Sequence, residues 1–188
     1  MRRFCFFILL ALLLAPAAFA QRTAKGQSFV GSSYLISFPG AASGVSLEYG
    51  MYLQHSYWMS GAGLIFDSVA LSNGLSVDVL ESVWSGGWMW RPFWTRSRDV
   101  SMYVGGGLLL GAEIYDPAWK LERSRKTLPD GSVLEGGRFI VGIQPSVELE
   151  WFFLPKVALT VSLDAPFIFL SRTGVARFCA GAGLRFNI

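Results

Sequence analysis

The amino-acid sequence predicts an all-β protein, a small antiparallel transmembrane β-barrel of about eight strands of the outer-membrane type. Three observations predict this class. The chain is 52% hydrophobic and only 15% charged, whereas average soluble domains carry roughly 25% charged residues. Its apolar residues recur at every second position, which is the period of a β-strand. Beyond the N-terminal segment, no stretch reaches the ~18 consecutive apolar residues that a membrane-spanning helix needs.

Residues 1–20 are expected to be a Sec-type signal peptide. Two arginines precede a short apolar core, and residues 18–20 (Ala-Phe-Ala) form a small-residue cleavage site. As a membrane anchor the segment is short, since a span takes ~20 residues, and Pro16 interrupts it. Cleavage after Ala20 leaves residues 21–188 as a single β-barrel domain that is exported from the cytoplasm.

Removal of the signal peptide changes the charge and the cysteine content. The formal net charge falls from +3 to +1, because Arg2 and Arg3 leave with the signal. No whole-chain electrostatic argument for nucleic-acid binding remains. Cys5 leaves as well, and Cys179 alone cannot form an internal disulfide.

The clearest strand pattern runs from Arg138 to Phe153. Its odd positions are apolar throughout and its even positions are mostly polar, so one face suits lipid and the other suits a barrel lumen. Glu148 and Glu150 lie on the lumenal face. The pattern is least clear over 57–93, where glycines interrupt it. We expect strands at 27–38, 44–54, 57–67, 80–93, 100–115, 138–153, 157–169 and 175–188.

The C-terminal strand is amphipathic to its last residue. Between Ala176 and Ile188 every second residue is apolar, with Phe186 near the end. This ending resembles the signal by which outer-membrane barrels are recognised for assembly, with isoleucine in place of the commoner terminal phenylalanine.

The spacing of the strands predicts how they are connected. Short connections at 55–56, 94–99 and 154–156 are expected on the periplasmic side, and the long 116–137 segment is expected outside. Six tryptophans are interpreted as residues of the membrane-interface belts. They are Trp58, Trp84, Trp88, Trp90, Trp94 and Trp151.

The sequence gives little support for catalysis, and we expect no enzymatic activity, no cofactor and no metal site. His55 is the only histidine and precedes Ser56 at a predicted turn. A hydrolase would also need an orienting carboxylate and an oxyanion hole. One histidine and one mature cysteine, far apart, supply no metal-ligand cluster.

Charged residues on the lumenal faces are expected to pair with one another. Glu148 and Glu150 lie two residues apart on one face, and Arg138, Arg177 and Arg185 are their candidate partners. Loss of such a pair would cost stability rather than activity.

The segment 120–126 carries four basic residues and one acidic residue. Such a segment can bind nucleic acid or anionic lipid headgroups, but we favour a solvated external loop. Residues 128–132 form a predicted turn, because proline presets φ and glycine permits positive φ.

Several short motifs resemble the TraO family of conjugal transfer proteins, which conjugative transposons of Bacteroides-type bacteria encode. The motifs are Gln21-Arg22, residues 25–27 (Lys-Gly-Gln), the 128–131 turn (Leu-Pro-Asp-Gly) before a long strand, and the ending at 180–188. The order of segments matches over most of the chain, and the region 39–95 matches only loosely.

The resemblance implies an envelope component of the mating apparatus with a structural or assembly role. The implied partners are outer-membrane lipids and other conjugal transfer proteins of the envelope. Direct nucleic-acid binding is not expected, because an eight-stranded barrel has a packed interior. Two alternatives remain: a generic barrel that serves adhesion or envelope integrity, and a lipid-modifying barrel enzyme that uses His55 and Ser56.

Overall fold

The computed structural model describes residues 25–38, 42–70, 76–95, 99–115, 126–127, 133–134, 137–171 and 176–188. The regular elements in these ranges are all β-strands, and the ranges contain no helix long and apolar enough to cross a membrane. The expected signal peptide, most of the basic segment and the 128–132 turn lie outside the described residues.

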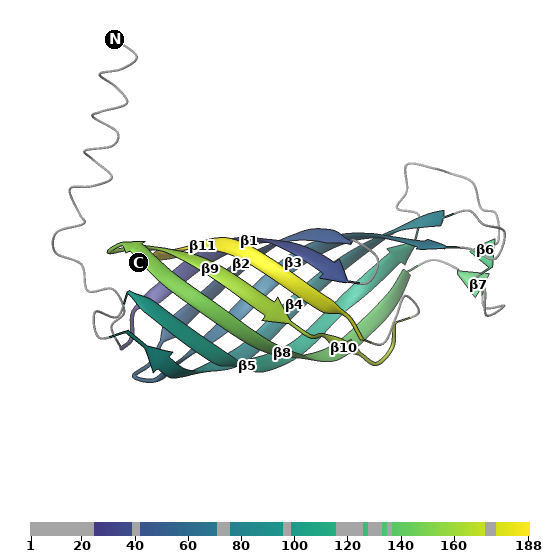
Figure 1. Ribbon diagram of the computed structural model, residues 1–188. Helices are drawn as coiled ribbons and strands as arrows, with labels where there is room; N and C mark the ends of the chain where they lie inside the picture. The colour runs from purple at the N-terminus through teal and green to yellow at the C-terminus, as the bar shows by residue number, and fades with distance from the viewer. Residues whose placement is uncertain are drawn as a thin grey trace, which may run out of the picture.

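The described strands form a closed antiparallel barrel of eight strands, as predicted (Figure 1). Neighbours in sequence pair from β1 to β5, then β5 pairs with β8, and β11 lies between β1 and β9. Pairing of β8 with β9 closes the barrel. The strands are β1 (Ser28–Phe38), β2 (Ser43–Tyr52), β3 (Ser56–Ala70), β4 (Ser76–Trp94), β5 (Val100–Tyr115), β8 (Gly137–Leu154), β9 (Val157–Asp164) and β11 (Phe178–Asn187).

The strand expected at 157–169 is interrupted. Strand β9 ends at Asp164, and the two-residue β10 (Phe167–Ile168) resumes the pairing with β8 at Ile143 and Gly142. Pro166 lies in the gap and has no backbone N–H to donate to a ladder. The alternation continues across the break, which is why the sequence pattern reads as one strand.

The segment expected to be a long loop contains a small ribbon of its own. Strands β6 (Lys126–Thr127) and β7 (Val133–Leu134) pair with each other in a separate two-stranded sheet. The ribbon lies at the end of the barrel away from the C-terminus (Figure 1). We call this end the loop end, and the end with the C-terminus the terminal end.

The terminal end holds the three short connections that the sequence predicts. Backbone hydrogen bonds join each connection to a neighbouring strand: Arg91 donates to His55, Phe152 to Asp99, and Asn187 to Lys156. The start of β1 lies here too, since Ile188 donates to Ser28. The predicted division between short connections at one end and the long segment at the other is confirmed.

Burial is inverted relative to a soluble protein. Exposed large apolar side chains outnumber the buried ones, and buried polar and charged residues include four arginines, glutamates and aspartates on β8, β9 and β11. In β8 the even positions, including Glu148 and Glu150, are buried and the odd positions face outward. The two environments that the alternation predicts are therefore the lumen and an apolar outer surface.

The lumen is filled in layers. At the terminal end, aromatic rings pack with Met89 and Ala158, and toward the loop end there are two smaller groups, one with Leu109 and one with Val79 and Tyr115. Side chains thus fill both ends of the interior, as the small size of an eight-stranded barrel requires. The aromatic group consists of Phe29, Tyr52, Tyr57, Tyr103 and Phe152.

Candidate functional site: a charged lumen inside an apolar barrel

Arg185 lies at the centre of a buried ion cluster near the terminal end. Its side chain is fully buried. Its Nη1 and Nη2 donate to the two oxygens of Glu148 at 2.8 and 2.9 Å, a bidentate arrangement. Nη1 also donates to Glu150 at 2.9 Å, and Nη2 to Glu48 at 2.8 Å. One guanidinium from β11 therefore joins three carboxylates from β2 and β8.

Aromatic side chains complete this Arg185 cluster. The guanidinium carbon lies 4.2 Å from the ring centroid of Phe29 and 4.8 Å from that of Tyr57, within the range of cation–π contacts. The hydroxyls of Tyr52 and Tyr103 donate to Glu150. The cluster thus links β1, β2, β3, β5, β8 and β11 across the lumen.

A second arginine lies at the loop end, just before β11. Arg177 pairs with Glu81 of β4, and its Nη1 lies 3.7 Å from Asp67 of β3. Glu113 of β5 accepts hydrogen bonds from Tyr115 and Ser171. The segment that ends the chain thus supplies a cation to each end of the lumen.

The predicted pairing with Glu148 and Glu150 is confirmed for Arg185. Arg138 and Arg177 have neighbours other than the predicted ones. Arg177 binds Glu81 and Asp67, because strand tilt places it near β3 and β4. Arg138 lies opposite Glu113 in the β5–β8 register, well away from Glu148. The sequence analysis did not single out Glu48, although the alternation of 44–54 places it on the polar face.

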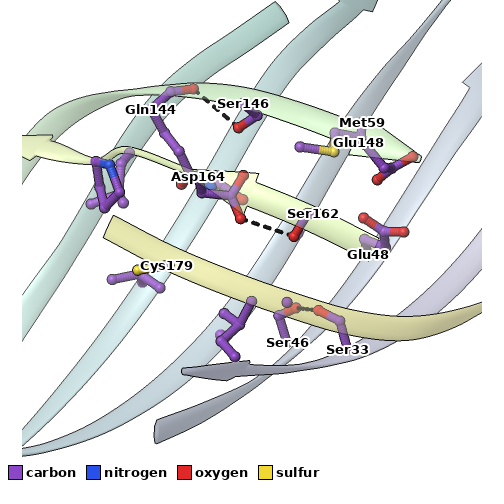
Figure 2. Close-up of a pocket in the computed structure, with 18 of the residues that line it drawn as sticks. Ser33, Ser46, Glu48, Met59, Gln144, Ser146, Glu148, Ser162, Asp164 and Cys179 are labelled. Carbon is purple, nitrogen blue, oxygen red and sulfur yellow. Dashed lines mark hydrogen bonds between the residues drawn. The ribbon is translucent and has the colours of Figure 1, made fainter. Parts of the chain in front are cut away.

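The lumen also holds a chamber whose wall combines polar and apolar side chains (Figure 2). The cavity has a volume of about 100 Å³, and Asp164, Ser162 and Gln144 are in its wall. Ser162 donates to Asp164 at 3.1 Å, and the hydroxyls of Ser33 and Ser46 lie 2.6 Å apart. Hydroxyl, amide and carboxylate groups can hold water or a small polar solute here.

The residues considered for catalysis lie apart from the lumen. His55 is exposed in the β2–β3 turn, and its ring centroid lies 5.7 Å from that of Trp94. In the described residues no hydrogen bond or ion pair joins its side chain to a carboxylate. In the same ranges, no group of three or more His, Cys, Asp or Glu is arranged to hold a metal ion. Arg91 is buried near this turn and was not considered in the sequence analysis. Its guanidinium donates to the Gln54 carbonyl at 2.7 Å and lies over the Trp94 ring.

Aromatic residues on the outer surface gather toward both strand ends, as interface belts do. The prediction was wrong for Trp84, which lies near the middle of β4. Its indole N–H donates to Ser60 at 2.9 Å, so it needs no partner at the interface. Outward aromatics near the terminal end are Tyr49, Trp58, Trp88, Trp90, Phe93, Trp94, Trp151, Phe153 and Phe186, and near the loop end they are Phe38, Phe66, Phe139, Phe167, Phe169 and Phe178.

A closed eight-stranded barrel with a polar, packed lumen and an apolar outer surface defines a small β-barrel of the outer-membrane class. Solved structures agree. Neisserial surface protein A is 14% identical, with a TM-score of 0.60 over 86% of this chain and 96% of that one. The N-terminal β-barrel domain of Pseudomonas aeruginosa OprF is 16% identical, with a TM-score of 0.59 over 87% and 100%.

The attachment invasion locus protein Ail of Yersinia pestis, solved with a heparin analogue, is 13% identical, with a TM-score of 0.55 over 88% of this chain and all of that one. At these identities the likeness shows the fold alone. A search of curated proteins finds no match.

The family described as "Conjugative transposon protein TraO" matches residues 40–188. The chain therefore belongs to the TraO family, as the resemblance in its motifs predicted.

Proposed function

We propose that this protein is the outer-membrane barrel of a conjugative transposon's transfer apparatus, with a structural or assembly role. The observation that carries this proposal is the TraO family match over residues 40–188. The apolar outer surface and its aromatic ends support residence in the outer membrane of a Gram-negative bacterium, after cleavage of the signal peptide. The expected partners are outer-membrane lipids and other transfer proteins of the envelope.

The contents of the lumen support a scaffold rather than a conduit for DNA. Duplex DNA is wide enough to admit an α-helix into its ≈ 12 Å major groove, whereas an eight-stranded barrel has an interior just wide enough for side chains to fill. Here the fully buried Arg185, Tyr57 and Phe29 occupy the lumen near the terminal end. The position of His55 against Trp94, away from any carboxylate in the described residues, supports a non-enzymatic role.

The test is the conjugation frequency of the host element after an in-frame deletion of this gene. We expect transfer to fall by several orders of magnitude and to be restored by the intact gene. The His55→Ala variant should restore transfer equally well, since no catalysis depends on that residue. Outer-membrane fractionation should show equal amounts of the barrel in the strains complemented with the intact gene and with His55→Ala.

Unchanged transfer in the deletion strain would refute the proposal. Loss of adhesion or envelope integrity in that strain would then favour a generic barrel. A change in lipid composition that the His55→Ala variant also causes would favour a lipid-modifying enzyme.

A further inference from the structure

The chamber in the lumen has an unbalanced charge. Its wall contains the carboxylates of Glu48, Glu148 and Asp164, and neither a lysine nor an arginine. Glu48 and Glu148 share Arg185, which lies beneath the chamber. Asp164 is the carboxylate that this arginine does not reach, and Figure 2 shows its side chain among polar groups at the middle of the chamber.

Asp164 is buried and its contacts are neutral. Ser162 donates to it at 3.1 Å, and the side chains of Gln144 and Ser146 also hydrogen-bond to it. In the described part of the chain, no lysine or arginine forms an ion pair with this carboxylate. A buried carboxylate without an opposite charge is costly, so buried charges are paired or coordinate cations.

Tyr57 provides an independent sign of a missing occupant. Its side chain is fully buried and lines the same chamber. Its hydroxyl interacts with Arg185, but it makes no hydrogen bond of standard geometry with any described residue. Buried hydroxyls are nearly always satisfied by protein or ordered water. A hydrated occupant of the chamber would supply the partner that the protein does not.

The size and the donors of the chamber indicate what the occupant is. A cavity needs about 10–15 Å³ of space for a water-sized probe to hold one water, and this chamber offers about 100 Å³, so it has room for one small ion and several waters. Carboxylate, amide and hydroxyl oxygens are ligands for hard cations. Within the described ranges no group of three His, Cys, Asp or Glu is arranged for a metal ion, which disfavours a divalent ion with several charged ligands.

We propose that the chamber binds one monovalent alkali cation, sodium or potassium, with Asp164 as its charged ligand. The oxygens of Ser162, Ser146 and Gln144 are its neutral ligands, and water bridges it to the Tyr57 hydroxyl. The ion neutralises the carboxylate that the arginines leave uncompensated. It stabilises the folded barrel, since no such chamber exists in the unfolded chain.

The test is the thermal unfolding midpoint of the full chain, folded in detergent micelles, measured by heat-modifiable gel mobility. Sodium, potassium and choline chloride are compared at equal ionic strength, because the methyl groups around the nitrogen of choline keep its charge away from oxygen ligands. We expect a higher midpoint in sodium or potassium than in choline. Once the ion exceeds its dissociation constant, each tenfold increase should raise the midpoint by about 3–6 °C.

Asp164→Asn keeps the shape of the side chain and removes its charge. We expect the difference between the salts to disappear, and the variant to be at least as stable in choline as the original protein. Asp78→Asn, at an exposed position of β4, is the matched control and should keep the difference. If Asp164→Asn does not fold, Ser162→Ala should fold and show a smaller difference.

Three results would overturn the proposal. One is an equal midpoint of the original protein in all three salts. The second is an undiminished difference between salts in the Asp164→Asn or Ser162→Ala variant. The third is a midpoint that falls with rising pH equally in every salt, because a proton would then neutralise Asp164 in place of the ion.

Discussion

Replacement of Arg185 by methionine should destabilise the barrel severely, because it leaves three carboxylates in the lumen without their cation. Arg185 is fully buried and lies within 2.8–2.9 Å of Glu48, Glu148 and Glu150. Removal of one partner from a buried ion pair costs about 3–5 kcal/mol. Loss of the two ring contacts adds about 1 kcal/mol. We expect the free energy of unfolding to fall by about 4–6 kcal/mol.

The assay is urea unfolding of the barrel in micelles, followed by tryptophan fluorescence and by gel mobility. Lys156→Met, in the exposed β8–β9 turn, removes a cation without burying a charge and should change stability by less than about 0.5 kcal/mol. Adding Glu48→Gln, Glu148→Gln and Glu150→Gln to Arg185→Met should recover most of the loss, because an uncharged interior carries no unpaired ion. An Arg185→Met variant as stable as Lys156→Met would refute the reasoning.

Three further predictions follow from the packing of the barrel. Gly50→Ala should cost about 1–3 kcal/mol of unfolding free energy, because the new Cβ would overlap an aromatic ring of β1. At Gly63, which is also lumenal, the nearest atoms would lie 3.3 Å from a Cβ, so Gly63→Ala should cost less than half as much. Equal costs in urea unfolding would contradict this. Leu47→Arg, at a side chain that is 68% exposed in the middle of β2, should cost about 2–4 kcal/mol in a bilayer, and Val100→Arg at the end of β5 about 0–1 kcal/mol; similar costs in lipid vesicles would argue against a membrane-embedded outer surface. The buried Cys179 should react with a thiol reagent far more slowly in the folded barrel than in urea, and equal rates measured by absorbance would show that the lumen is open to the reagent.

The barrel itself could be predicted from the sequence because each strand separates two environments. The alternation over 138–153 predicts β8 nearly to its ends, and 100–115 matches β5. The 57–93 region was harder, since Gly61, Gly63, Gly86 and Gly87 carry no side chain to mark a face. There the structure extends β3 to Ala70 and begins β4 at Ser76, which is beyond the predicted limits of both strands.

The lumenal site could be predicted only in part. Alternation places Glu148 and Arg185 on lumenal faces, but it does not give the register that brings them together. Glu48 and Arg185 are 137 residues apart in sequence and meet because β11 pairs with β1 and faces β2 across a narrow lumen. The same lack of register information explains why Arg177 was assigned to Glu148 and Glu150 rather than to Glu81. The chamber around Asp164 depends on all of these registers and had no signal in the sequence.

The position of both arginines on the last segment of the chain links the closure of the barrel to the balance of its charge. Strand β11 lies between β1 and β9, so the barrel closes only when this strand is in place. Until then, Glu48 and Glu148 lack Arg185, Glu81 lacks Arg177, and these carboxylates remain hydrated. Closure removes water from these carboxylates and brings Arg185 and Arg177 to them in the same step. A barrel that closed with β11 in another register would bury the acids without the cations, and the cost of unpaired buried charge disfavours that product. The lumenal ion pairs thus favour one register of the closing strand. Because β11 has four small residues between Cys179 and Leu184, β-propensity and apolar alternation cannot specify that register.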